Sequence, residues 1–470
     1  MVRGRTSAHR LFLAIACLAL SIFASAAFVP QSNFAAADTN PIQHVIIISV
    51  DGLKPESYAD ADAHGLKIPT LREMVRSGAS SDGVIPVMPS VTYPSHTTMV
   101  TGVVPGVHGI FTNLQFDPTG QNLAGWRWYA EDIRVPTLWQ VARNRGFRTT
   151  LIHWPVTVGS MADINVPEYW RANTAEDLKL LRALSTPGIF TDTAAAFPDF
   201  NSFFASLDTL DNAWTEMACY SIEKIQPNLL LLHLAQVDHW QHEKGPFSPE
   251  ANAAIEAADA QIARVIASAK KAGIWQTTAI VVVSDHGFAP ISQSLKPAIL
   301  LRDHGLITLD AQNRVTAWKA AALTADGSAY IYLHDANDDA TRRALLDIFT
   351  PLAGAPASGV RRVANHADIV KMGGDASAFL ALEAADGFEL VPGVTGNYLE
   401  PSKHKGTHGY FPDHPEMRAS FLAFGPPIGS AKISDARLID VAPTVARWLG
   451  LDLSKAEGKP LDIPVHAANR

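Results

Sequence analysis

Short runs of apolar, mostly β-branched residues recur along the chain and are separated by polar segments. The clearest runs cover residues 44–50, 228–234 and 278–284, and weaker ones cover residues 148–152 and 420–424. Continuous apolar runs of this length are typical of strands that are covered on both faces, as in a parallel sheet. The pattern therefore predicts the interior strands of a mostly parallel sheet.

Helical patterns alternate with these strands. They cover residues 136–145, 212–224, 249–272 and 438–449. The alternation predicts an α/β fold in which a mostly parallel central sheet is flanked by helices on both faces, with right-handed crossovers. The stretch from about 294 to 400 contains a strand-like run at 328–333, and we expect it to hold a small inserted subdomain.

The first residues have the pattern of a targeting segment. Three arginines precede an apolar run at residues 11–23, and small residues at 24–26 follow it. This order predicts a secretory signal that is too short for a comfortable membrane span. Residues 35–37, three further alanines, offer a second cleavage site, and the sequence does not choose between the two.

Residues 1–37 are therefore interpreted as a signal peptide and leader, and residues 38–470 as the mature domain. An uncleaved anchor and a lipoprotein modified at Cys17 are the alternatives, although Cys17 lies inside the apolar run. No later apolar run approaches the roughly 20 residues of a spanning helix. We expect a periplasmic or secreted protein with no membrane span after signal removal. Its single remaining cysteine, Cys219, excludes an internal disulfide.

Composition narrows the classes of function. The chain has 470 residues, 47% of them hydrophobic, which is enough to build a large core and excludes disorder over most of its length. The formal net charge of −8 argues against a protein that coats nucleic acid, because such binding depends on lysine and arginine. A small anionic substrate is still compatible with this charge.

Acidic and imidazole residues follow three of the predicted strands. Asp51 follows the first, the segment 235–242 follows the second, and Asp285 with His286 follows the third. Ligands of open α/β sheets bind beyond the carboxyl ends of the strands. One such residue would be an ordinary turn or structural residue. Three strand ends together indicate a metal or catalytic cluster.

The spacing of these residues supports a metal site. Asp238 and His242 are four residues apart, which places both on one face of a helix. His408 lies in a glycine-flanked segment, 406–410, where the backbone can approach a ligand closely. Aspartate and histidine without cysteine suit zinc, with manganese or iron as weaker alternatives, and differ from an all-oxygen calcium cage.

A hydroxyl nucleophile is available in the segment 88–102. Pro94 can occupy a first helical turn, so Thr92 would lie at the entrance to a helix. A threonine there can bind a metal, lose its proton and attack an anion held by helix N-terminal amides. The alternative is that Thr92 only caps the helix. The predicted metal cluster favours the nucleophile.

Taken together, these motifs resemble the alkaline phosphatase superfamily and, within it, the nucleotide pyrophosphatase/phosphodiesterase family. The resemblance extends from about residue 44 to 450. It is carried by residues 49–52, 89–102, 107–113, 238–242, 284–287, 406–409 and 438–444.

The resemblance implies two Zn²⁺ ions per chain. The first zinc would be held by Asp51, Thr92, Asp285 and His286. The second would be held by Asp238, His242 and His408. Asn113 would donate a hydrogen bond to a phosphoryl oxygen. Tyr93 falls where family members carry an aromatic that stacks on the nucleobase, although it could equally pack in the core.

The function implied is an exported, metal-dependent phosphodiesterase or nucleotide pyrophosphatase. It would hydrolyse nucleotide-type diesters through a phosphothreonine intermediate on the two-zinc site. Residues 93–121 contain no arginine or lysine, and this favours diesters over the more highly charged monoesters.

Several alternatives stay open, as does the oligomeric state. A related zinc hydrolase could act on phosphonates, phosphate monoesters or phospholipid headgroups, the last with Trp126, Trp128 and Trp154 as an apolar entrance. An envelope phosphate-group transferase would usually carry spanning helices. An inactive zinc-stabilised binding protein would not need Thr92 in its full setting.

Overall fold

The computed structural model describes residues 40–121, 125–171 and 174–466. The predicted signal and leader, residues 1–37, lie outside the described residues. From Asn40 onward the chain forms one compact unit.

An eight-stranded sheet forms the centre of this unit. Its strands, in spatial order, are β18 (Ala431–Ile433), β2 (Ala79–Ser81), β17 (Phe421–Phe424), β6 (Thr278–Val283), β1 (His44–Val50), β5 (Leu229–Leu234), β3 (Thr149–Trp154) and β4 (Ile164–Pro167). From β6 to β4 all neighbours are parallel. The predicted mostly parallel α/β sheet is therefore confirmed.

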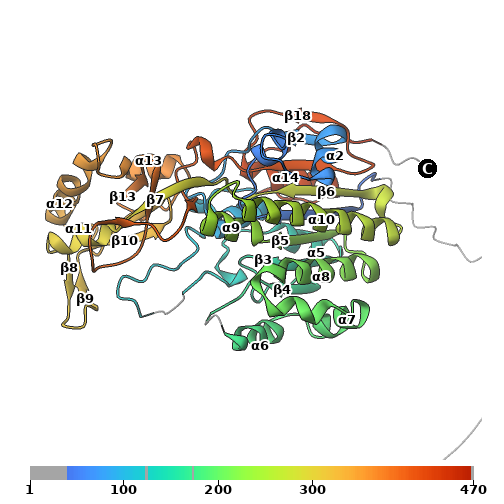
Figure 1. Cartoon of the computed structure of the whole chain (residues 1–470), viewed down its shortest axis with the longest axis horizontal. Coiled ribbons are helices and arrows are strands. Elements are labelled where there is room, and N and C mark those ends of the chain that lie inside the picture. Colours follow the sequence, from blue (N-terminus) through green and yellow to red (C-terminus); the bar gives the residue numbers. More distant parts are fainter. Residues whose placement is uncertain (1–39, 122–124, 172–173, 467–470) are drawn as a thin grey trace, which may run out of the picture. The chain divides into compact units, whose positions relative to one another are not determined.

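Helices cover both faces of the sheet because its central strands are apolar on both sides. Along β1, Ile46 and Ile48 enter one core while Val45 and Ile47 enter the other. The first core is closed by α2 (Pro69–Ser77), α8 (Leu210–Lys224) and α10 (Pro249–Lys271). The second is closed by α3 (Thr92–Thr101), α5 (Leu138–Asn144) and α14 (Val441–Leu449). Figure 1 shows α8 and α10 running along the sheet.

The sequence prediction differs from the structure at one strand. The run at 420–424 does form a strand, β17, but it lies antiparallel to both β6 and β2. A short apolar run shows that a strand is buried on both faces, which is common in parallel sheets but does not fix the direction of one strand. The predicted helices are present with ends that shift by up to three residues.

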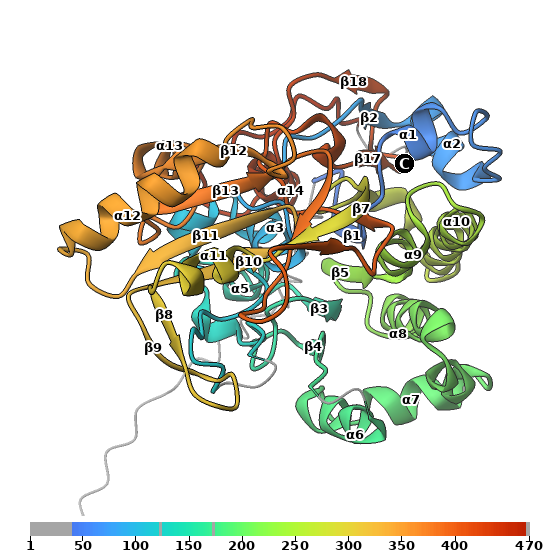
Figure 2. The same cartoon turned by 60° about the vertical axis from the view of Figure 1, so that its left-hand side comes forward.

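The stretch between β6 and β17 builds smaller sheets with their own core. One is antiparallel, in the order β10 (Ala320–Ala325), β11 (Ser328–Leu333), β13 (Leu380–Ala384) and β12 (Val360–Asn365). Another joins β14 (Gly387–Leu390), β7 (Ala289–Leu295), β15 (Leu399–Pro401) and β16 (Gly406–Thr407), and a hairpin joins β8 (Ile307–Leu309) to β9 (Val315–Trp318). Figure 2 shows α12 (Asp339–Phe349) beside β11 and β13.

The other helices are short connections around these sheets. They are α1 (Glu56–Ala59), α4 (Pro105–His108), α6 (Ala175–Leu184), α7 (Ile189–Ala196), α9 (Gln236–Lys244), α11 (Pro297–Asp303) and α13 (His366–Lys371). Among the described residues, no helix combines the length and the apolar character needed to cross a membrane.

Candidate active site

A first cluster of ionisable side chains lies at the carboxyl ends of the neighbouring strands β1 and β6. It consists of Asp51, Asp285 and His286. The Nε2 atom of His286 lies 3.3 Å from Asp51 Oδ1 and 3.0 Å from Asp285 Oδ2. None of the three side chains is more than 5% exposed. The sheet therefore brings together two residues that are more than 230 positions apart in sequence.

A second cluster adjoins the first and consists of Asp238, His242 and His408. Asp238 and His242 lie on α9, as predicted, with His242 Nε2 3.5 Å from Asp238 Oδ2. His408 Nε2 lies 3.6 Å from Asp238 Oδ1. The rings of His408 and His286 stack with their centroids 3.7 Å apart, so the two clusters are in direct contact.

The loop that carries His408 is fixed by a close backbone approach. Gly409 has a φ of 82°, and a Cβ there would lie 2.1 Å from the carbonyl oxygen of Ala325. The N–H of Gly409 donates to the carbonyl of Ser90, which also accepts from His408 Nδ1 at 3.2 Å. This glycine therefore ties the second cluster to the segment that leads into α3.

The three histidines are oriented in a way that suits metal binding. Each Nδ1 donates to a backbone carbonyl: His286 to Gly287 at 3.0 Å, His242 to Gly406 at 3.0 Å and His408 to Ser90 at 3.2 Å. A histidine that binds a metal through one ring nitrogen characteristically donates a hydrogen bond from the other. In each case Nε2 is left for the cluster.

Buried atoms without hydrogen-bond partners mark the same place. They are Asp51 Oδ1, Asp285 Oδ2, His286 Nε2 and Asp238 Oδ1. Buried polar atoms are normally satisfied, so four such atoms facing one another need a shared partner. Two overlapping sets of these residues offer ligand atoms within 4.8 Å of one another: Asp51, Asp285 and His286, and Asp238, His286 and His408. The donors fit divalent cations.

The negative charge of the site also favours the binding of divalent cations. The pKa of Asp51 is raised well above its usual value by burial and then by the negative charges of Asp285 and Asp238. Three carboxylates this close are costly to ionise together. Divalent cations between the carboxylates would offset both the cost of burial and the repulsion between the negative charges.

Thr92 is the first residue of α3, and the N-cap position before it is occupied by Val91. Thr92 therefore does not occupy the N-cap position that the alternative interpretation gave it. The carbonyl of Thr92 accepts from His96 Nδ1 at 2.8 Å, and that nitrogen lies 3.7 Å from Asp285 Oδ2. One imidazole thus links the first turn of α3 to the first cluster.

Asn113 lies against the same helical turn. The N–H of Tyr93 donates to Asn113 Oδ1 at 2.9 Å. The Asn113 NH₂ group is not used in this bond and can donate to another group. Pro94 has no N–H, and Ser95 donates to the Val91 carbonyl, so within the described residues the Thr92 amide is the one N–H of the first turn that has no hydrogen-bond partner. The helix N-terminus therefore offers one amide to an anion.

The interior position of Tyr93 contradicts its predicted stacking on a nucleobase. Its side chain is fully buried with Trp128 and Val156, and its hydroxyl lies 3.4 Å from Glu168 Oε1. No face of the ring is open to a ligand, so core packing is the correct interpretation. Trp128 and Trp154 are likewise buried, and this removes most of the apolar entrance suggested for lipids.

The sequence interpretation missed several buried residues beside Asp51. His233 Nε2 lies 3.0 Å from Asp51 Oδ2, and His233 Nδ1 lies 3.0 Å from Glu168 Oε2. Burial opposes the charge on His233, but the two carboxylates outweigh it and raise its pKa well above the usual value. The available signal was a single histidine near the carboxyl end of an otherwise apolar strand.

Known proteins match the part of the chain that contains both clusters. A model of the type I phosphodiesterase/nucleotide pyrophosphatase family matches residues 45–411. An uncharacterised pyrophosphatase/phosphodiesterase of Schizosaccharomyces pombe is 27% identical over 404 residues, which cover 82% of this chain and 72% of that protein. Human ectonucleotide pyrophosphatase/phosphodiesterase family member 1 is 22% identical over 251 residues, covering 52% of this chain but only 23% of its own length.

Solved structures show the same fold. An inactive threonine-to-alanine variant of murine ectonucleotide pyrophosphatase/phosphodiesterase 5, in complex with AMP, superposes with a TM-score of 0.59 and 20% identity. The match covers 87% of this chain and 96% of that one. The human form of the same protein gives a TM-score of 0.60.

Proposed function

The chain belongs to the type I phosphodiesterase/nucleotide pyrophosphatase family of the alkaline phosphatase superfamily, and we propose that it hydrolyses nucleotide-type phosphate diesters with Thr92 as nucleophile between two Zn²⁺ ions. Family membership makes it a hydrolase of phosphodiester or pyrophosphate bonds. The proposal adds the metal, the nucleophile and the class of substrate.

The observation that carries the proposal is the set of orphaned ligand atoms beside the first turn of α3. Asp51, Asp285 and His286 would hold one cation together with the Thr92 hydroxyl, and Asp238, His242 and His408 would hold the other. Bound there, divalent cations would favour loss of the threonine proton and stabilise charge on the phosphoryl and leaving oxygens.

The residues of the chain then have distinct tasks. The Thr92 hydroxyl attacks phosphorus and the bond to the leaving oxygen breaks, which gives a phosphothreonine ester. Water hydrolyses this ester and restores Thr92. The Asn113 NH₂ group and the free Thr92 amide donate hydrogen bonds to non-bridging oxygens, so that positioning supplies much of the catalysis. The inactive threonine-to-alanine relative with AMP supports this assignment by similarity.

Among the described residues, no lysine or arginine forms an ion pair with either cluster, and this supports diesters as substrates. Asn113 is neutral, and the nearest arginine along this strand segment, Arg127, donates its backbone N–H to the Asn113 carbonyl. Burial lowers the pKa of the Arg127 guanidinium, and the charges that act on it come from Asp132, Tyr332, Asp375 and Arg134, none of which belongs to the clusters. A monoester would bring one more negative charge, and in the described part of the chain the ion pairs of the clusters offer no lysine or arginine to meet it.

We also propose that the protein is exported, on the basis of the leader pattern at residues 1–37. Fusing a reporter that is active only outside the cytoplasm to the full chain, and to a chain that lacks these residues, tests this. Equal reporter activity in both fusions would contradict export.

Initial rates on a p-nitrophenyl nucleotide diester and on p-nitrophenyl phosphate test the proposed reaction. We expect the zinc-loaded protein to prefer the diester, and Thr92→Ala to lower its turnover by at least about 10³-fold. Thr92→Ser is the matched control, because it keeps a hydroxyl and should keep measurable activity. Faster monoester turnover, or substantial activity in Thr92→Ala, would contradict the proposal.

A further inference from the structure

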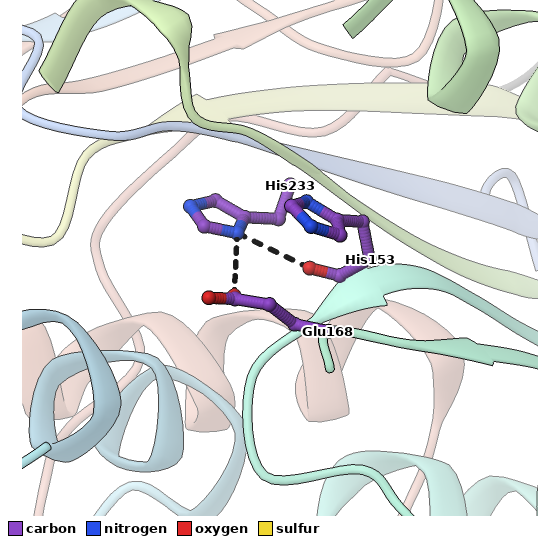
Figure 3. Close-up of side chains that lie close together, drawn as sticks. All are labelled: His153, Glu168 and His233. Carbon is purple, nitrogen blue, oxygen red and sulfur yellow. Dashed lines mark hydrogen bonds and ion pairs between the residues drawn. The ribbon is translucent and has the colours of Figure 1, made fainter. Parts of the chain in front are cut away.

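A histidine in the central sheet lies between two buried carboxylates. His233 Nε2 is 3.0 Å from Asp51 Oδ2, and His233 Nδ1 is 3.0 Å from Glu168 Oε2. None of the three side chains is more than 5% exposed. Figure 3 shows His233 bonded to Glu168 and to the backbone carbonyl of His153.

These residues form a line across four adjacent strands at their carboxyl ends. Asp51 follows β1, His233 lies in β5, His153 lies in β3 and Glu168 follows β4, and this is the order of the strands in the sheet. At the far end, Glu168 Oε1 lies 3.4 Å from the hydroxyl of Tyr93, the neighbour of Thr92. The line therefore connects a proposed metal ligand to the helix that carries the nucleophile.

The partners of His233 determine where its hydrogens are. Nδ1 faces the carbonyl oxygen of His153 at 3.1 Å as well as Glu168, and a carbonyl can only accept. Nε2 faces a carboxylate that accepts no other hydrogen bond through this oxygen. His233 thus donates through Nδ1, and its Nε2 shares a hydrogen bond with Asp51 Oδ2. This holds Asp51 Oδ2 in place and leaves Asp51 Oδ1 facing His286.

The same side chains could instead be considered a third metal site. Ligand atoms of His153, Glu168 and His233 lie within 4.8 Å of one another. The carbonyl beside His233 Nδ1 argues against this, because a nitrogen that donates a hydrogen bond has no lone pair for a cation. The hydrogen-bonding arrangement favours a positioning role.

We propose that Glu168 and His233 form a positioning relay that holds the Asp51 carboxylate in the orientation the first metal requires. The inference rests on the proposed function, because the relay has a purpose only if the first cluster binds a cation. Hydrogen-bond partners behind a metal ligand typically contribute 10-fold to 100-fold to metal affinity.

Zinc affinity of the two clusters, measured by competition with a chromophoric chelator, tests the relay. In His233→Gln, whose amide can donate to only one of the two carboxylates, we expect affinity for one zinc to fall about 10-fold to 100-fold. The other zinc should bind as in the original chain, and excess zinc should restore turnover. Glu168→Gln keeps an acceptor for His233 and should cost less than 10-fold.

Two controls separate the outcomes. His153→Asn removes the imidazole next to the relay, keeps the backbone carbonyl and tolerates the positive φ of 54° found there, so zinc affinity should not change. Melting of the zinc-free variants shows whether each one folds. Unchanged affinity in both relay variants would overturn the proposal, and so would a third zinc that is lost in His153→Asn. An original chain that binds no zinc would instead overturn the proposed function.

Discussion

The two clusters of the site are built differently. In the first cluster the side chains of Asp51, Asp285 and His286 are at most 5% exposed and come from adjacent strand ends. In the second cluster, Asp238 and His242 are each 20% exposed and lie on a helix, while His408 comes from a glycine loop. The strands of the sheet position the side chains of the first cluster, whereas a helix and a loop outside the sheet position those of the second.

This difference has consequences for the cations that we propose to bind at the two clusters. Buried carboxylates are strongly destabilising without a partner, so the first cluster depends more on a cation and should release it slowly. The second cluster is nearer to solvent and rests on α9, whose first turn donates to Asp211 through the N–H groups of Ala235 and Gln236. We expect its cation to exchange more readily.

The largest effect is expected from Asp285→Asn in the first cluster. The amide can still accept from the N–H of Gly52, which lies 3.1 Å from Asp285 Oδ1, so the backbone should hold. Diester hydrolysis should fall by at least about 10³-fold, because a metal contributes several kcal/mol to this reaction. Rates measured with increasing zinc should show no recovery. Recovery of activity would mean that the first cluster exchanges its cation as readily as the second cluster.

A smaller, reversible effect is expected from the matched change in the second cluster, Asp238→Asn. This more exposed cluster should lose affinity and still admit a cation, so activity should fall roughly 10²-fold and rise again with added zinc. Metal analysis should find one zinc fewer at low zinc concentration. If Asp238→Asn is as inactive as Asp285→Asn at every zinc concentration, the two clusters do not differ in the way described.

The smallest effect concerns Asp211, which anchors the helix of the second cluster. Burial raises the pKa of Asp211 to about 6. The folded protein therefore binds a proton between about pH 4 and pH 6 that the unfolded chain does not bind, and the free energy of unfolding falls as pH rises through this range. The contribution is at most about 3 kcal/mol.

Urea unfolding at pH 4.5 and at pH 6 measures this contribution. The decrease in the free energy of unfolding should be smaller in Asp211→Asn than in the original chain. Asp208→Asn, which removes an exposed carboxylate from the same segment, is the control for the loss of one charge. Equal decreases in all three proteins would show that Asp211 does not carry the effect.

Much of the fold was predictable because burial on both faces leaves a clear pattern. The strands at 44–50 and 278–283 are mostly apolar, and each is followed by residues of the first cluster. The antiparallel direction of β17 was not predictable, because direction depends on the connections before it. The spacing of Asp238 and His242 gave the second cluster as soon as a helix was assumed.

The errors at the site have a different origin. Tyr93 follows the proposed nucleophile, but its burial depends on tryptophans from a distant segment that sequence spacing does not place. His233 resembles an ordinary core residue until Asp51 and Glu168 are known to lie on either side. Roles that depend on neighbours from separate strands needed the structure.

An anomalous difference map at the zinc absorption edge, from crystals grown with zinc, tests the two-metal site most directly. We expect two peaks, one among Asp51, Thr92, Asp285 and His286 and the other among Asp238, His242 and His408. A map without peaks at these clusters, or with its strongest peak among His153, Glu168 and His233, would contradict the proposed site.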